Sequence, residues 1–242
     1  MWEAAAWGFV GGAALLVGAV LGLLWRPSGA VIGSVMAFGS GVLISAVAFD
    51  LTADAFDLGG AWPVVGGMAA GALSFFVGDW ILNRRGGGDR KRSSGRQIEG
   101  QASAIVLGSL LDGVPESIAI GVSLLGGGTV GVAIVVAVFL SNVPEALSAA
   151  TGLRRAGHSP RWILGLWFAV AVVSAVAAAA GYVLLGGAPP EYVGVSQAFA
   201  AGAILTMLAD TMMPEAYEEG GPLAGLLTCL GFATAFLISH LA

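Results

Sequence analysis

The chain has 242 residues, of which 57% are hydrophobic and only 10% are charged. A soluble domain carries about 25% charged residues, so this composition predicts an all-α polytopic membrane protein and excludes an ordinary soluble domain. The single cysteine excludes an internal disulfide and a thiolate metal cluster, the two histidines exclude a His-rich site, and the net charge of −5 gives no sign of nucleic-acid binding.

Eight apolar runs are each long enough to cross a bilayer, which takes roughly 20 residues. They cover about residues 4–25, 30–52, 61–82, 101–125, 129–152, 162–186, 193–214 and 222–241. The first run lacks a positively charged leader, so we interpret it as a span rather than a signal peptide. Together the runs predict a single transmembrane domain over residues 1–242.

The basic residues predict the orientation. All ten lie in the first, third and fifth connections: Arg26; Arg84, Arg85, Arg90, Lys91, Arg92 and Arg96; and Arg154, Arg155 and Arg161. The positive-inside rule makes that side cytoplasmic. Both termini are then outside, and residues 83–100 form a cytoplasmic linker between the third and fourth spans. The short chain, rich in Ala, Gly and Val, leads us to expect a prokaryotic inner cell membrane.

One pattern recurs between the second and seventh spans. Residues 37–41 (AFGSG) return as 198–202 (AFAAG), and at the same offset residues 54–60 (DAFDLGG) return as 215–221 (EAYEEGG). The odd separation in spans makes the copies cross the membrane in opposite directions, which is typical of inverted-topology transporter repeats. We therefore predict a 3+2+3 arrangement with spans 1–3 repeated as spans 6–8. Chance similarity between Ala- and Gly-rich helices is the alternative.

Three carboxylates lie in the middle of the two central spans. Asp112 and Glu116 belong to residues 112–116 (DGVPE), and Glu145 ends residues 141–145 (SNVPE). A charge at the centre of a bilayer is costly, so an ionisable residue there indicates a functional site. Neither run contains a basic residue to neutralise the carboxylates, which points to protons or a cation.

The same two motifs supply further oxygen atoms. Residues four apart share one face of a helix, which groups the two carboxylates of the fourth span and a hydroxyl with a carboxylate on the fifth. Each proline also frees the carbonyl four residues earlier, those of Leu111 and Leu140. An oxygen-rich set suits Mg²⁺, Ca²⁺, Mn²⁺, Zn²⁺ or Fe²⁺. The predicted metal ligands are Asp112, Glu116, Ser141, Asn142 and Glu145.

Two other interpretations of these carboxylates stay open. They could be protonated and hydrogen-bonded between helices in a purely structural role. They could also form a proton relay, which keeps the carboxylates but does not need the paired prolines.

The spans and motifs together resemble the ZIP family of divalent-metal transporters, which has eight spans in a 3+2+3 arrangement and both termini outside. The resemblance covers essentially the whole chain and is most specific at residues 114–116 and 143–145, which both read VPE. Residues 210–215 are similar to the family's seventh-span Pro-Glu segment. The resemblance implies bridging metal ligands at Glu116 and Glu145. The other family ligand positions fall on Asp112, Ser141 and Asn142.

The chain also departs from the family pattern. Neither central motif contains a histidine, Gly113 stands where the family usually has Asn, and the glycine that usually follows each glutamate is Ser117 or Ala146. The sixth span has no carboxylate. Losing imidazole removes the nitrogen ligand that favours zinc. We expect one metal ion per site, with Zn²⁺ as first candidate and Cd²⁺, Fe²⁺ and Mn²⁺ as further ones.

Five more acidic residues are candidates for the pathway of the ion. They are Asp50 and Asp54 at the outer entrance, Asp79 and Asp210 in the inner half, and Glu215 in the seventh-span segment. A solvated helix end is the alternative for these positions. Glycine spacings such as Gly18/Gly22, Gly29/Gly33 and Gly67/Gly71 favour close helix packing and are compatible with a homodimer.

We therefore predict a transporter that moves a divalent metal cation toward the cytoplasm by alternating access, with the metal ion and the lipid bilayer as its partners. A proton-coupled carrier of another small solute and a transport-deficient family member are the alternatives. An intramembrane enzyme is disfavoured, because the sequence has neither a His-Glu-x-x-His motif nor a nucleophile–base pair.

Overall fold

The computed structural model describes residues 1–25, 27–84, 102–126 and 131–241. The helices in chain order are α1 (Trp2–Trp25), α2 (Gly29–Ala46), η1 (Val47–Thr52), α3 (Ala53–Gly59), α4 (Ala61–Arg84), α5 (Ala102–Ser123), η3 (Leu124–Gly126), α6 (Val132–Arg155), α7 (Pro160–Leu185), α8 (Pro190–Met207), η4 (Leu208–Met212), α9 (Met213–Gly220) and α10 (Leu223–Leu241). The described residues contain no strand. All but the first two residues of the predicted linker 83–100 fall outside them.

The fold is that of an all-α polytopic membrane protein. Seven of the helical runs are long and apolar enough to cross a membrane, counted over the described residues. The eighth long helix is α5, which holds the first of the two acidic motifs. Local signals fix where helices begin: Ser28 caps α2 by accepting a hydrogen bond from the Val31 N–H at 3.4 Å, and Ser159 caps α7 just before Pro160.

The apolar runs predicted from the sequence leave acidic gaps at residues 53–60 and 215–221, but the helices do not end where these gaps begin. The chain stays helical through both, as η1–α3 and as η4–α9. Helix ends come only at Gly60 and Gly221, whose φ angles of 73° and 67° are left-handed and favour glycine. Charged side chains at the end of a span are solvated without leaving the helix, which explains why polarity alone misplaced these ends.

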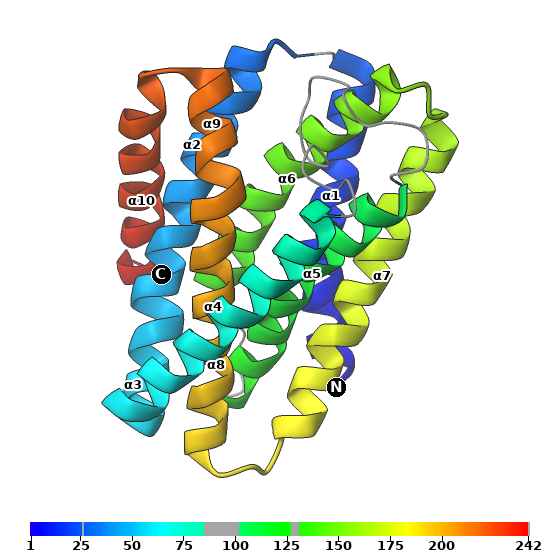
Figure 1. The fold of residues 1–242 in the computed structure, drawn as a ribbon. Coiled ribbons are helices and arrows are strands. Elements are labelled where there is room, and N and C mark those ends of the chain that lie inside the picture. The colour runs from blue at the N-terminus through cyan, green and yellow to red at the C-terminus, as the bar shows by residue number, and fades with distance from the viewer. Residues whose placement is uncertain (26, 85–101, 127–130, 242) are drawn as a thin grey trace.

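The predicted inverted repeat is present in the backbone. A π-helical segment begins at Val47 in the first copy and at Leu208 in the second, and these positions are equivalent under the offset of the repeat. The terminating glycines, Gly60 and Gly221, are equivalent under the same offset. Figure 1 shows α2 and α8 running in opposite directions through the bundle. Two matched interruptions of this rare kind make chance similarity untenable.

The repeats are interlocked, because the second helix of each packs against the third helix of the other. A methyl group added at Gly231 of α10 would collide with the Phe38 carbonyl of α2. Equally, one added at Gly71 of α4 would collide with the Phe199 carbonyl of α8. Phe38 and Phe199 are the paired residues of the recurring pattern, so the pattern marks a reciprocal helix contact.

The helices form two groups. We call α1, α5, α6 and α7 the motif group, because they pack on one another around the two acidic motifs. The framework group consists of α2, α4, α8 and α10 with their short neighbours η1, α3, η4 and α9. The groups meet mainly where α6 faces α2 and where α5 faces α8. The pseudo-two-fold relation therefore pairs helices within each group. It relates α1 to α7 and α5 to α6 in the motif group, and α2 to α8 and α4 to α10 in the framework group.

The glycine spacings noted in the sequence are used inside the chain. Gly18 lies against the Val143 carbonyl of α6, Gly33 against α9, and Gly67 against the Val195 carbonyl of α8. Close helix approach accounts for these glycines. They therefore give no separate support to a homodimer, which stays a prediction.

Candidate metal centre

The two Pro-Glu motifs lie in the middle of α5 and α6, and neither proline ends its helix. All five predicted ligands are buried: Asp112, Glu116, Ser141, Asn142 and Glu145. Glu116 is only 1% exposed and is among the largest fully buried side chains of the molecule. Burial of so many polar groups is costly unless they are paired or bind an ion.

Two of these side chains are oriented by hydrogen bonds. The Ser141 hydroxyl donates to the Val138 carbonyl of its own helix at 3.0 Å. The Asn142 Nδ2 donates to the Gly11 carbonyl of α1 at 3.1 Å. Because the donors are occupied, the hydroxyl and amide oxygens keep lone pairs that can accept a cation.

Helix α1 supports α6 in a way that the sequence analysis did not anticipate. A methyl group at Gly18 would collide with the Val143 carbonyl, and one at Gly22 would lie 2.7 Å from the Leu147 carbonyl. The Gly11 carbonyl also fixes Asn142. The density of glycines in the first span was the signal that could have shown this contact.

The two central helices face each other with few direct contacts. Helix α5 packs mainly on α7 and α8, whereas α6 packs mainly on α1 and α2. Framework residues reach the motif on α6: Gly39 of α2 leaves room for the Leu140 carbonyl, which a methyl group there would approach to 3.2 Å. Leu140 is one of the two residues whose carbonyl the motif prolines were expected to free.

Within the described residues, no three His, Cys, Asp or Glu side chains come together closely enough to hold a metal ion. The three carboxylates Asp112, Glu116 and Glu145 therefore do not form a closed carboxylate cluster in this arrangement. A mixed set, in which Ser141 and Asn142 supply neutral oxygen atoms, stays a prediction.

Polar residues continue along α6 from the motif toward one end of the bundle. Ser148 and Thr151 follow Glu145 at steps of three, and both are buried. The Ser148 hydroxyl donates to Glu215 Oε1 of α9 at 2.7 Å. Thr151 returns its hydroxyl to the Leu147 carbonyl at 2.8 Å. These groups mark a polar path away from the motif.

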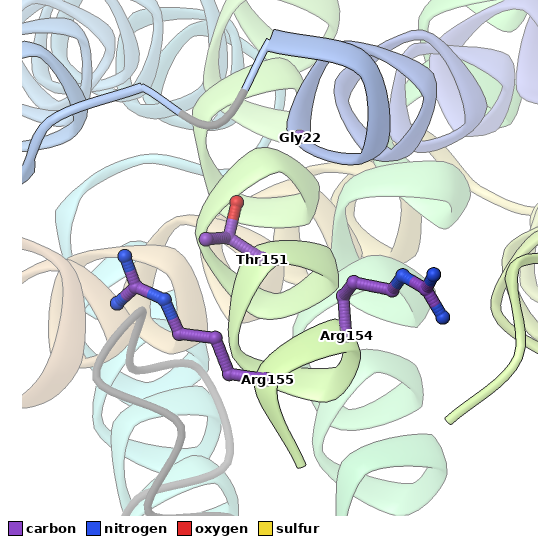
Figure 2. A pocket seen from close by; sticks show the side chains of 4 residues that line it. All are labelled: Gly22, Thr151, Arg154 and Arg155. Carbon is purple, nitrogen blue, oxygen red and sulfur yellow. The ribbon is translucent and has the colours of Figure 1, made fainter. Parts of the chain in front are cut away.

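The path leads to a cavity of about 430 Å³ at the end of α6. Its described lining residues are Gly22, Thr151, Arg154 and Arg155. Figure 2 shows the two arginine side chains extending to opposite sides of α6, with Thr151 beneath Gly22. We call this end of the bundle, where α6 ends and α7 begins near Arg161, the arginine-rich face. It is the face that the charge distribution predicts to be cytoplasmic.

The pathway candidates fall into two sets. Asp79 and Glu215 are buried in the bundle, and Asp79 accepts a 2.6 Å hydrogen bond from Asn83 Nδ2. Asp54 and Asp210 are exposed. Asp50 is half-buried and accepts a hydrogen bond from Ser239 at 2.9 Å. Glu215 is connected to the polar path on α6 by the hydrogen bond from Ser148.

An inverted repeat that surrounds two central helices, with polar side chains buried at their prolines, is the architecture of a secondary transporter. The sequence identifies the family to which this architecture belongs, because the model of the ZIP zinc transporter family matches residues 82–239. This match covers more than half of the chain, which therefore belongs to the ZIP zinc transporter family. Its general function is transport of divalent metal ions. Comparison with individual curated proteins gave no match.

Proposed function

We propose that this protein carries a divalent metal cation through a centre on α5 and α6. The ion enters from the far side of the membrane and leaves at the arginine-rich face. The observation that carries the proposal is the burial of a Pro-Glu motif on each central helix. Neither helix has a basic residue near its motif, because Arg154 and Arg155 stand at the far end of α6. A dication bound between the two motifs would balance the charge of the buried carboxylates.

The ligands we propose are five oxygen-bearing side chains with distinct roles. Glu116 and Glu145 hold the ion, Asp112 and Asn142 complete the shell, and Ser141 contributes weakly. Such a shell lacks imidazole and thiolate, so it discriminates less strongly in favour of zinc than a nitrogen-containing shell does. Zn²⁺ is our first candidate and Cd²⁺, Fe²⁺ and Mn²⁺ follow, with one ion per centre.

The movement we propose is a displacement of the motif group against the framework group. The two groups are each well packed internally and meet over a smaller surface, which is the condition for rigid-body motion. Movement of this kind would expose the centre alternately to the two faces.

Metal uptake by proteoliposomes tests the proposal. Purified protein is reconstituted, and uptake of Zn²⁺, Cd²⁺, Fe²⁺, Mn²⁺ and Mg²⁺ is compared between the wild type, Glu116→Ala and Glu145→Ala. Removing a ligand from a buried oxygen shell should lower uptake at least about tenfold. Glu191→Gln, a change in the exposed first turn of α8, is the matched control and should transport normally.

The alternatives give other results. A proton-coupled carrier would move protons in the absence of added metal and would take up none of the five metals. A transport-deficient protein would move neither. Uptake that persists in Glu116→Ala and Glu145→Ala would remove the centre from α5 and α6 while leaving the family function intact.

A further inference from the structure

The hydrogen bond between Ser148 and Glu215 joins the two helix groups. Ser148 lies on α6 in the motif group and Glu215 on α9 in the framework group. The donor and acceptor atoms are 2.7 Å apart, and the two side chains are 0% and 7% exposed. A bond at this position stretches as soon as one group moves past the other.

Other buried hydroxyls in the bundle are used differently. Ser40 donates to the Met36 carbonyl at 2.9 Å, Ser117 to Gly113 at 2.6 Å, and Thr151 to Leu147 at 2.8 Å. Each of these acceptors lies on the same helix as its donor. Such a bond keeps its length when the groups move, because its donor and acceptor move together. The bond from Ser148 joins the two groups and is stretched by the same movement.

At the described positions that the internal repeat relates, this connection is present on one side only. The offset that relates the two copies makes Asp54 the equivalent of Glu215, and the offset between the VPE motifs makes Ala119 the equivalent of Ser148. Asp54 is exposed, and Ala119 has no hydroxyl to donate. The opposite face therefore has no counterpart of this bond.

We propose that Ser148–Glu215 is a one-sided tie, which stabilises the present arrangement of the two groups and breaks during each transport cycle. The proposal rests on the proposed function, because it requires the groups to move. A hydrogen bond from a hydroxyl to a carboxylate is stronger than one between two neutral groups. Its loss should shift the equilibrium between arrangements about tenfold toward the alternative one. Without a counterpart on the other face, the tie biases the cycle toward one state.

Cross-linking tests whether the two residues separate. In a Cys229→Ser background, Ser148→Cys and Glu215→Cys are combined and joined by a short bifunctional thiosulfonate, which a reductant removes. We expect Zn²⁺ uptake to stop on cross-linking and to return, on reduction, to the level of the double variant before cross-linking. The matched control joins Phe9→Cys to Phe168→Cys. In the wild type the ring centroids of these two residues are 6.4 Å apart, and both lie in the motif group. That cross-link should leave uptake unchanged. Uptake that continues through a verified Ser148–Glu215 cross-link overturns the tie.

Hydrogen–deuterium exchange gives a readout that does not depend on transport. Amides of residues 148–155 and of α9 should exchange up to about tenfold faster in Ser148→Ala than in the wild type. Ser40→Ala, which removes an equally buried hydroxyl that bonds its own helix, should leave exchange at those amides unchanged. Equal exchange in Ser148→Ala and wild type overturns the tie. A wild type that takes up no metal would instead contradict the proposed function. The exchange result would still show whether the bond between Ser148 and Glu215 stabilises the present arrangement.

Discussion

The two halves of the inverted repeat share a backbone but differ in what their carboxylates contact. Each half has a π-helical segment, a short continuation helix and a terminating glycine at equivalent positions. In the second half, Glu215 is buried and accepts a hydrogen bond from the motif group. In the first half, its equivalent Asp54 is exposed. A symmetric scaffold thus holds an asymmetric set of polar contacts, which is what a transporter resting in one of two related states requires.

The shared backbone gives the largest expected effect. Gly41 and Gly202 are equivalent, and a methyl group at either would collide with a backbone carbonyl of the partner helix, Thr228 or Met68. Gly41→Ala and Gly202→Ala should each lower the free energy of unfolding by about 3 kcal/mol, because a backbone cannot move aside as a side chain does. Denaturation in mixed micelles measures this.

The control for these changes is Gly66→Ala, since a methyl group there meets nothing within 4 Å. It should be neutral or stabilising by up to about 1 kcal/mol through helix propensity. If Gly41→Ala were costly and Gly202→Ala harmless, the two interfaces would not be equivalent and the comparison would break.

The terminating glycines come next. Gly60 and Gly221 have φ angles of 73° and 67° with extended ψ values of −175° and −154°, a region that residues with a side chain rarely adopt. Gly60→Ala and Gly221→Ala should each cost about 2 kcal/mol in unfolding free energy, although both positions have open space around them. Thermal unfolding followed by circular dichroism would show two similar shifts, and a large difference would mean that only one turn is constrained.

The motifs themselves differ at their first two positions, where α6 has Ser141 and Asn142 and α5 has Asp112 and Gly113. Asn142→Ala would remove the donor to the buried Gly11 carbonyl, and we expect a loss of about 1–2 kcal/mol in unfolding free energy. The matched control is Gln197→Leu. That buried amide has an Oε1 without a hydrogen-bond donor in the described part of the chain, so its removal should cost less. Equal losses would show that the hydrogen bond from Asn142 to the Gly11 carbonyl of α1 does not stabilise the fold.

The smallest effect concerns the end of the bundle opposite the arginine-rich face. Ser239→Ala would remove the hydrogen bond to Asp50, which joins α10 to η1 within the framework group. The bond is only partly buried, so a loss of about 0.5–1 kcal/mol in unfolding free energy is expected. Because both partners move together, the maximal rate of metal uptake should not change. A reduced rate would mean that α10 moves relative to α2.

Much of the fold could be predicted from the sequence, because its strongest signals are long-range and regular. Eight apolar runs, arginines confined to alternate connections and a pattern around Phe38 and Phe199 are sufficient for the all-α inverted repeat. The helix ends could not be predicted as well. The stretch around Asp54 is polar enough for a loop, yet it is helical up to Gly60, since a helix at the membrane boundary satisfies its own backbone while its charges stay in water.

The site could be predicted only in part. Polarity within an apolar span is visible in a sequence, which is why Glu116 and Glu145 could be named as candidate ligands, and both are buried. Contacts between distant segments are not visible in the same way. Neither the Gly11 carbonyl behind Asn142 nor the hydroxyl of Ser148 against Glu215 has a local signature, because both depend on how α1 and α9 pack against α6.

Equilibrium binding of Zn²⁺ to the purified protein tests the central claim most directly. We predict one ion bound per chain in the wild type and in Glu191→Gln, and affinity reduced at least about tenfold in both Glu116→Gln and Glu145→Gln, which keep the volume but lose the charge. Binding of unchanged stoichiometry and affinity in both variants would contradict a metal centre on α5 and α6.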